Sequence, residues 1–410
     1  PAAPATSDAS ADSEIIVTAT RRNVALSDVP LAVSAVSAVN LQNAGATDIR
    51  QLNQLSSSLL VSSSQSEAAG GVARIRGVGT VGDNPGLESS VATFIDGVYR
   101  NRSGVALTEL GAIDRIEVLR GPQGTLFGRN ASAGLINVIT EAPSFEEGGT
   151  AEFSYGNYNY WRAQVGLTGP INDKIAYRID GILTKRDGFL KESNDYPGSS
   201  GRDFNDRNRW LVRGQLKLEP TDTLSVRLIA DYAKRNEQCC AATFLPAIEH
   251  YRSGSDILSR PNATAALERA LGAVINDDTF GHRVSVTPGR DYHSDVQDRG
   301  ISAEINWEAG FGKLTSITAY RDWDLKRGTD ADFSNLDILY RDAYRQRFKT
   351  FTQEVRLQGK AFDDKLDWLV GGYFANESLD LKDNLRFGAQ YGLFEGCRVV
   401  GGAIAALGLP

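Results

Sequence analysis

Apolar and polar residues alternate along many segments of the chain from about residue 149 onward. Every second residue is apolar between Leu224 and Tyr232, and the same pattern recurs between Ile301 and Trp307. Because successive side chains of a β-strand point to opposite faces, this period of two predicts strands with one apolar face. Nine such strands are predicted, at residues 150–156, 160–169, 174–185, 209–219, 223–234, 298–308, 313–324, 347–359 and 365–378.

The connections between these strands favour a membrane barrel over a soluble β-sandwich, which also alternates. The strands run to about ten residues, the length that a tilted transmembrane strand needs. After a short first loop at 157–159, tight turns alternate with long loops at 186–208, 235–297 and 326–346. Aromatic residues lie near strand ends, as in an interfacial girdle: Tyr155, Trp161, Trp210, Tyr232, Trp307, Trp323, Trp368 and Phe374. We predict a transmembrane β-barrel with its short turns in the periplasm and its long loops outside.

The number of predicted strands suggests that more strands belong to the barrel. Single-chain bacterial barrels close with an even number of strands. An open sheet would leave unpaired backbone groups in lipid, where each costs several kcal/mol. We therefore expect the natural protein to extend past Pro410 and its barrel to have about 22 strands.

The chain before residue 149 has a different pattern. Residues 1–13 are small and polar and predict a disordered arm. From there to about residue 148, short apolar runs alternate with glycine-rich turns, which indicates a small α/β domain. Within it, the apolar residues of 46–60 (Ile49, Leu52, Leu55 and Leu59) predict one amphipathic helix.

Composition and charge narrow the functional classes. The mean hydropathy is -0.28 and no run of 18 apolar residues occurs, which argues against a transmembrane helix. The formal net charge of -7 argues against nucleic acid as a partner. The sequence contains no G-x-S-x-G, H-E-x-x-H or C-x-x-C pattern, so we predict no enzyme, no cofactor and no metal site.

Three segments carry a resemblance to a known family, in the order that the family has them. They are SEIIVTATRR (13–22), RIRGVG followed by VATFIDGVYRNR (74–79 and 91–102), and AIDRIEVLRGPQGTLFGRNASAGLINVITEAP (112–143). With them, the chain resembles the TonB-dependent receptors. The resemblance implies a TonB box at 14–19, a plug domain at 20–148 inside the barrel lumen, and the N-terminal part of the barrel at 149–410.

The residues of the segment that resembles the TonB box also predict, by themselves, a strand that can bind another protein. Ile15, Ile16, Val17 and Thr18 favour an extended conformation, and such a strand can pair with the sheet edge of another protein. We expect the TonB-binding residues to be Glu14, Ile15, Ile16, Val17, Thr18 and Ala19. The alternative is that this segment is simply the first strand of the N-terminal domain.

Charged residues are dense within the other matching segments. In the family, plug arginines and carboxylates pair with each other and with carboxylates of the barrel wall. Such pairs can hold a plug in place and still be rearranged. The resemblance therefore implies a plug–barrel charge network of Arg74, Arg76, Asp114, Glu117, Arg120 and Arg129, with ordinary solvated side chains as the alternative.

The loop at 235–297 holds candidate ligand-binding residues. Loops this long are usually functional or disordered, and a short helix is predicted over 265–274. Guanidinium and imidazole groups suit an anionic chelate, so the candidates for ligand capture are His250, Arg252, His282, Arg283 and His293. The alternative is a solvated cover over the barrel mouth.

The three cysteines suggest one disulfide in an oxidising compartment. Adjacent cysteines rarely bond each other, so we expect Cys239 or Cys240 to pair with Cys397 in another outer loop.

The resemblance implies active import of a scarce solute across the outer membrane of a Gram-negative bacterium. Ligand binding would release the TonB box, and TonB of the inner-membrane energising complex would pull on it. The other partners are outer-membrane lipid and a small molecule, for which an iron–siderophore complex is the first expectation. Vitamin B12, an oligosaccharide or an aromatic compound are alternatives, and a passive porin or structural surface barrel is the alternative of another class.

Overall fold

The computed structural model describes residues 15–63, 71–80, 84–100, 109, 111–244, 248–253, 255–363 and 365–406. The chain divides into two compact units, Pro1–Glu141 and Ala142–Pro410. Each unit has its own sheet, and the two are described separately.

The N-terminal unit is built on a five-stranded sheet with apolar residues on both faces. One face packs a cluster that includes Ile116 and Ile136, and the other packs Phe94, Leu119 and Leu135. Because both faces are covered, the strands at 91–95 and 134–140 are mostly apolar rather than alternating. The order is β3 (Val33–Ser37), β8 (Ile113–Arg120), β9 (Gly134–Thr140), β6 (Val91–Ile95) and β7 (Val98–Arg100), with only the β6–β9 pair parallel among these described strands.

Short elements surround this sheet. The helix α1 begins after Ser37, whose hydroxyl accepts a hydrogen bond from the backbone N–H of Asn40 at 3.3 Å. The elements are β1 (Ile16–Val17), β2 (Val24–Ala25), η1 (Leu26–Asp28), α1 (Ala38–Asn43), β4 (Leu59–Ser63), β5 (Gly71–Ile75) and α3 (Gly124–Phe127).

The predicted helix over 46–60 is wrong in length and type. A 3-10 helix, η2 (Ile49–Gln54), forms instead, and Leu59 already belongs to β4. Asp48 caps η2 by accepting from the backbone N–H of Arg50 at 2.8 Å. Three serines follow at 56–58, and serine hydroxyls compete for backbone hydrogen bonds, which explains why no long helix continues here.

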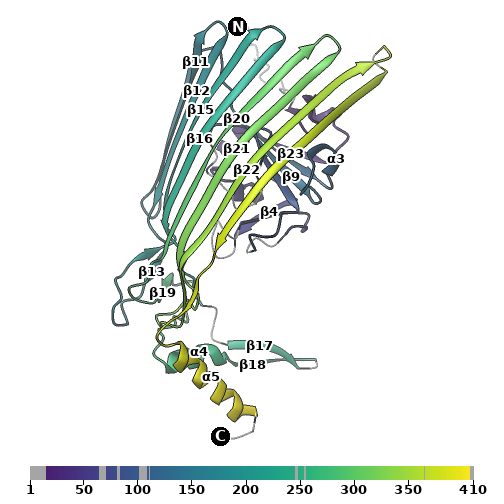
Figure 1. Ribbon diagram of the computed structural model, residues 1–410. Helices are drawn as coiled ribbons and strands as arrows, with labels where there is room; N and C mark the ends of the chain where they lie inside the picture. The colour runs from purple at the N-terminus through teal and green to yellow at the C-terminus, as the bar shows by residue number, and fades with distance from the viewer. Residues whose placement is uncertain are drawn as a thin grey trace, which may run out of the picture. The chain divides into compact units, whose positions relative to one another are not determined.

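The second unit contains the predicted strands, and their order in the sheet is the order of the sequence (Figure 1). All neighbouring strands on this path are antiparallel. The prediction of nine strands is confirmed: β10 (Gly148–Gly156), β11 (Tyr160–Asn172), β12 (Ile175–Arg186), β15 (Arg207–Thr221), β16 (Leu224–Gln238), β20 (His293–Ala309), β21 (Gly312–Asp330), β22 (Leu339–Ala361) and β23 (Leu366–Lys382).

The connections alternate in length as expected. Turns at 173–174, 222–223 and 310–311 lie at one end of the sheet, and the loops at 187–206 and 239–292 lie at the other. In the described part of the chain, β10 and β23 end the strand order and do not pair with each other. A barrel of about 22 strands therefore stays a prediction.

The two faces of this sheet have opposite chemistry. On one face, apolar side chains such as Val165, Ile179 and Ile301 are exposed, and on the other face Asp180 and Arg213 are buried. A soluble protein has the reverse arrangement. Exposed apolar and enclosed polar side chains on alternating positions are typical of a strand that faces lipid on one side and a lumen on the other.

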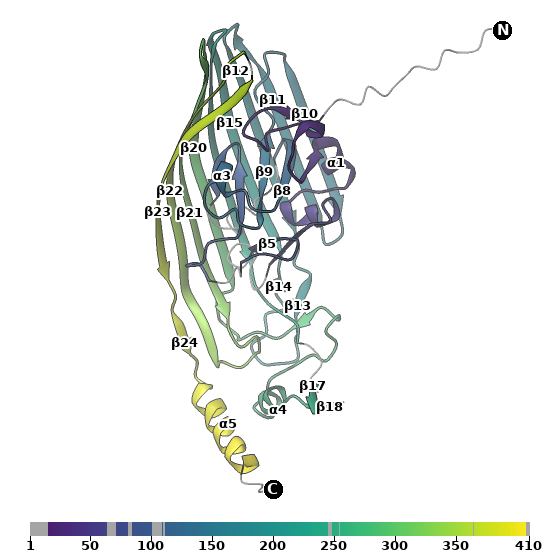
Figure 2. The ribbon, with the colours of Figure 1, turned by 90° about the vertical axis from the view of Figure 1, so that its right-hand side faces the viewer.

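The long loops form small structures at one end of the sheet, seen in both views (Figures 1 and 2). They are β13 (Leu190–Glu192), β14 (Asp203–Phe204), β17 (Ile248–Ser253), β18 (Asp256–Pro261), α4 (Ala263–Ala270), β19 (Arg283–Val284), β24 (Leu385–Phe387) and α5 (Tyr391–Ala406). The helix α4 is the one predicted over 265–274, and it ends earlier, before Gly272 with φ +98°. Among the described residues, no helix is long and apolar enough to cross a membrane.

Candidate functional site

The segment that resembles a TonB box is packed onto the N-terminal unit. Ile16 pairs with Ala25 and Val17 pairs with Val24, so β1 and β2 form a small antiparallel sheet. The side chains of Val17 and Ala19 are 0 % exposed. The structure therefore has the alternative arrangement, in which this segment is the first strand of the N-terminal unit. Glu14 lies outside the described residues, and a role in binding TonB stays a prediction.

A buried carboxylate holds this segment in place. Glu117 on β8 is 0 % exposed and accepts a hydrogen bond from the backbone N–H of Thr18 at 2.8 Å. The Thr18 hydroxyl donates to the same carboxylate at 3.0 Å, and the Asn137 side chain donates to both Thr18 and Glu117. Arg115 balances the charge, with its Nε 2.9 Å from Glu117. Sequence reasoning singled out Glu117 and Thr18 separately but gave no signal that they touch.

The geometry of β1 determines which of its edges is covered. The backbone N–H of Leu26 donates to the carbonyl oxygen of Ile15 at 2.8 Å, so Ile15 and Val17 face β2. Backbone groups of alternate residues in a strand point to opposite edges, so Ile16 and Thr18 face the other edge. Glu117 binds the Thr18 N–H on that second edge. A strand from another protein that pairs there would have to displace the Glu117 carboxylate.

The other predicted plug charges are distributed rather than gathered at one place. Arg74 donates to the Ser62 hydroxyl at 3.1 Å across the β4–β5 pair. Arg76 lies exposed at the turn that follows β5, with φ +52°. Arg120 donates to the carbonyl oxygen of Ala32 at 3.3 Å. These contacts hold neighbouring segments of the N-terminal unit together.

The remaining two of these charges also pair locally. Asp114 forms an ion pair with Arg115, which connects it to Glu117. Arg129 pairs with Glu88 at 3.0 Å, and both side chains are more than one-third exposed. Within the N-terminal unit, Asp114 and Glu117 are brought together through Arg115, and Arg129 lies elsewhere. The predicted pairing with the barrel wall stays a prediction.

The candidate ligand-capture residues lie on the loop elements of the second unit. His250 and Arg252 are on β17, and their side chains lie outside the described part of the structure. His282 and Arg283 are adjacent and exposed at the beginning of β19. His293 begins β20.

His293 is close to an acidic neighbour rather than to another histidine. Its Nδ1 lies 2.5 Å from Asp291. Among the residues that the structure describes, no three histidine, cysteine or acidic side chains are arranged to hold a metal ion.

The loops have a packed core that sequence reasoning missed. Phe204, Val286 and Tyr292 are buried together, and the Phe204 and Tyr292 rings meet edge-on at 5.3 Å. Beside them, the buried Glu192 accepts hydrogen bonds from the Tyr196 hydroxyl at 2.7 Å and from other donors. Burial alone would raise the pKa of the Glu192 carboxyl, but these hydrogen bonds outweigh it and hold the pKa below its usual range. The loop end is thus a defined structure, not only a solvated cover.

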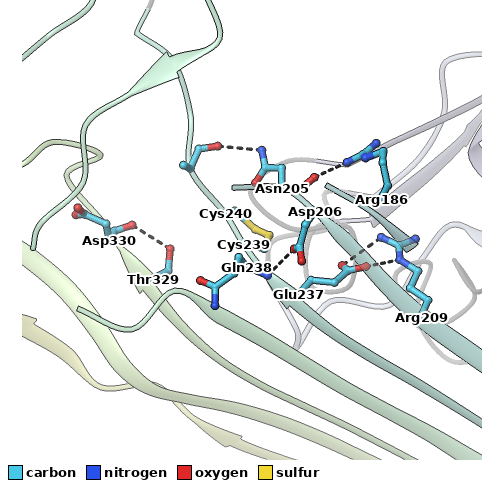
Figure 3. Close-up of a disulfide and its surroundings, with 11 residues drawn as sticks. Arg186, Asn205, Asp206, Arg209, Glu237, Gln238, Cys239, Cys240, Thr329 and Asp330 are labelled. Atoms are coloured by element: carbon cyan, nitrogen blue, oxygen red, sulfur yellow. Dashed lines mark hydrogen bonds and ion pairs between the residues drawn. A yellow bond between two sulfur atoms is a disulfide. The ribbon is translucent and has the colours of Figure 1, made fainter. Parts of the chain in front are cut away.

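The cysteine pairing differs from the expectation. Cys239 and Cys240 are bonded to each other at the end of β16, and Cys397 on α5 is free and exposed (Figure 3). Arg209 on β15 forms an ion pair with Glu237, which lies just before the disulfide (Figure 3). Cys397 belongs to a helix that packs against the α4 region. The predicted bond to Cys397 is therefore wrong.

Comparison with known proteins identifies a family model for the N-terminal unit and relatives of the chain. Residues 25–135 match the family model described as TonB-dependent Receptor Plug Domain. The chain therefore carries the plug domain of the TonB-dependent receptors. The pesticin receptor of Yersinia pestis is 29 % identical over 222 residues, and the ferric-pyoverdine 358 receptor of Pseudomonas putida is 25 % identical over 240 residues. Each match covers 52 % of this chain, but only 30 % and 28 % of the relative.

Solved structures of TonB-dependent receptors share the fold of this chain. The ferric yersiniabactin uptake receptor from Yersinia pestis has a TM-score of 0.70 at 20 % identity, and the match covers 87 % of this chain and 50 % of that one. A siderophore receptor from Acinetobacter baumannii has a TM-score of 0.65 at 16 % identity, covering 90 % and 49 %. This chain therefore spans about half the length of these receptors. The family is one of receptors and transporters in the outer membrane of Gram-negative bacteria, and the chain is an outer-membrane protein.

Proposed function

We propose that this TonB-dependent receptor imports a ferric siderophore across the outer membrane, using energy from TonB. The names of its relatives support this cargo class, since they include a ferric-pyoverdine receptor and a ferrioxamine B receptor. In this proposal, residues 20–148 form the plug inside the barrel lumen. The plug closes the path until ligand binds outside.

The observation that carries the proposal is how Thr18 is held. An ordinary first strand is fixed by an extended apolar interface and a full ladder of backbone bonds. Here only two residues pair with β2, Ile15 and Ile16 are 40 % and 42 % exposed, and the Thr18 N–H is bound by one carboxylate. Release of the strand requires the hydrogen bonds between Thr18 and Glu117 to break, at about 1.5–3 kcal/mol each, and the buried side chains of Val17 and Ala19 to leave the core, so we expect it to be coupled to a shift of β8. Released, it offers the edge carrying Ile16 and Thr18 to TonB.

The loop end of the barrel supplies ligand capture in this proposal. Exposed guanidinium and imidazole groups at His282 and Arg283 can bind the carboxylates or phenolates of an anionic chelate. The packed core around Phe204 and Tyr292 gives these residues a firm base. His250, Arg252 and His293 are the further candidates.

Growth of a deletion strain tests the cargo. The strain is compared with its parent on minimal medium in which iron comes from single purified ferric siderophores. In parallel, vitamin B12, oligosaccharides and aromatic compounds are supplied as sole sources of cobalamin or carbon. We expect a growth defect with at least one ferric siderophore, restored by the intact gene. A defect confined to one of the other nutrients would contradict the cargo but not the TonB-dependent mechanism.

A further inference from the structure

Basic residues follow one another along the enclosed face of β15. Alternate residues of this strand point to that face, and four of them are basic: Arg207, Arg209, Arg213 and Lys217. At about 3.3 Å of rise per residue, these four extend over roughly 33 Å, which is comparable to the thickness of the hydrocarbon core of a membrane. This cationic stripe runs from the loop end of the strand almost to the turn at 222–223.

Further cations lie directly opposite the stripe on its two neighbouring strands, β12 and β16. Three cross-strand pairs therefore join like charges: Arg186–Arg207, Arg209–Arg235 and Lys217–Arg227. With Arg178 and Arg213, the enclosed face of the three strands has eight basic residues, against four acidic ones: Asp180, Glu219, Asp231 and Glu237. Like charges directly opposite each other destabilise a sheet, so stability alone does not explain this arrangement.

The strands β20, β21 and β22 lack this excess of positive charge. On β20 and β21, over residues 294–327, three carboxylates of the enclosed face are matched by three cations. On β22, over residues 344–358, Glu354 forms an ion pair with Arg356 at 2.8 Å. The charge of the enclosed face is therefore balanced on these three strands and unbalanced around β15.

Arg213 lies midway along the stripe and is only 5 % exposed. Its cross-strand neighbours are Asp180 and Asp231. Each of these carboxylates binds another arginine, Asp180 at 2.9 Å from Arg178 and Asp231 at 2.6 Å from Arg321. The Nη1 atom of Arg213 is buried and has no hydrogen-bond partner among the described residues. Because an unsatisfied buried cation costs stability, this arrangement is typical of a binding residue rather than of a structural one.

We propose that the cationic stripe binds an anionic ferric chelate on its way through the barrel, with Arg213 as the central binding residue. The inference rests on the proposed function and specifies the charge of its cargo. Unused donors of a planar guanidinium suit negatively charged carboxylate or phenolate oxygens. An enclosed wall of one charge also raises the local concentration of ions of the opposite charge. Several cations in succession, rather than one strong site, allow the chelate to leave each position for the next.

Stability separates a binding role of Arg213 from a structural one. Because its Nη1 is buried without a partner, the full-length receptor with Arg213→Gln should unfold at the same temperature as the unmodified receptor or at a higher one. Arg321→Gln is the comparison, and it should unfold at a lower temperature because Asp231 and Asp298 lose the arginine that they share. A lower unfolding temperature of the Arg213→Gln receptor would show that Arg213 is paired in the folded protein and would overturn the inference.

Binding and uptake by whole cells test the role of Arg213 in transport. The probe is the radiolabelled ferric complex of the siderophore that supports growth of the parent strain but not of the deletion strain. With Arg213→Gln we expect unchanged surface binding and a maximum uptake rate lower by about tenfold or more, as for the loss of one charge-assisted hydrogen bond. Arg213→Lys keeps the charge without the planar fork and should keep roughly a third of the rate. The matched control is Arg356→Gln, which removes an arginine of the enclosed face outside the stripe and should leave uptake unchanged.

The outcomes separate this inference from the proposed function. If the ferric siderophore found by growth does not migrate as an anion in electrophoresis, or if the Arg213→Gln receptor imports it at the unmodified rate, the inference is wrong and siderophore import stands. Equal loss of uptake with Arg356→Gln would also contradict a special role of the stripe. If no ferric siderophore supports growth, the proposed function is wrong. The same comparison is then made with the nutrient that does support growth, and an anionic nutrient whose uptake depends on Arg213 would still support the stripe.

Discussion

Arg321 on β21 forms an ion pair with Asp231 on β16 at 2.6 Å, although strand β20 lies between them. The guanidinium also binds Asp298 on β20 at 2.6 Å. The side chain crosses β20 directly over Gly300, where an added Cβ would lie 2.4 Å from its Cδ. One arginine thereby joins three strands on the enclosed face of the sheet, and it can do so because residue 300 has no side chain.

We predict that Gly300→Ala destabilises the barrel by about 1–3 kcal/mol, because the methyl group forces Arg321 away from its two carboxylates. The matched control is Gly372→Ala on β23, where an added Cβ meets nothing within 4 Å. Thermal unfolding in detergent, followed by the loss of the heat-modifiable band on a gel, measures the difference. Equal stability of the two variants would show that the Arg321 crossing is not constrained at Gly300.

Thr18→Val should loosen the N-terminal strand without disturbing the rest of the N-terminal unit. Valine has the same shape but cannot donate to Glu117 or accept from Asn137. Losing these bonds costs about 1–3 kcal/mol, so amide hydrogens of 15–20 should exchange roughly five- to a hundredfold faster.

Thr140→Val is the matched control for this experiment. Its hydroxyl donates to the Asp96 carboxylate at 2.8 Å within the same unit rather than to Glu117. It should leave exchange at 15–20 unchanged. If the two valine variants behave alike, the Glu117 contact does not control the release of the strand.

The strands could be predicted because membrane strands impose a strict period of two on the sequence. The ends of these strands on the loop side could not be predicted in the same way. β22 begins at Leu339 rather than at 347, and β20 begins at His293 rather than at 298. Beyond the lipid, both faces of a strand meet polar surroundings, so residues such as Arg341 and Asp342 continue the strand without any alternation.

The candidate site could be predicted only in part, because the sequence pattern shows local conformation but not contacts between distant residues. Ile15 to Thr18 are recognisable as a β-prone segment from local sequence, but their docking depends on Glu117 and Asn137, which are about a hundred residues away. The apolar spacing of Ala46–Leu60 predicted one long helix. That spacing does not show that the serines at 56–58 compete for backbone hydrogen bonds and so prevent the helix from continuing. The Cys239–Cys240 bond was not predicted, because adjacent cysteines rarely bond each other and this pair is an exception.

Glu268 should make the stability of the α4 region depend on pH. Burial, and then the charge of Asp332, raises the pKa of its carboxyl to about 7 from 4.5. The folded state therefore holds a proton that the unfolded state has already lost between pH 4.5 and 7. Over that window the stability of the folded loop falls as pH rises, and above it the loss is complete.

We predict that Glu268→Gln removes most of this dependence. The protection factors of α4 amides against hydrogen exchange, compared at pH 5 and pH 8, provide the measurement. The unmodified protein should be less protected at pH 8, and the glutamine variant nearly equally protected at both. A glutamine variant with the same pH dependence as the unmodified protein would assign the effect to other groups.

We propose that residues 15–19 transmit the energy for transport through the edge of β1 that carries Ile16 and Thr18. Ile16→Pro removes the Ile16 backbone donor on that edge, whereas Ile15 and Val17 keep their pairing with β2. Ile16→Ala is the control, because it shortens the side chain and keeps the donor. The decisive measurement is binding and uptake of the same radiolabelled ferric siderophore by whole cells that carry each variant. We expect normal binding in both variants, normal uptake with alanine and no uptake with proline. Normal uptake with proline would show that this edge of β1 does not carry the energy for transport.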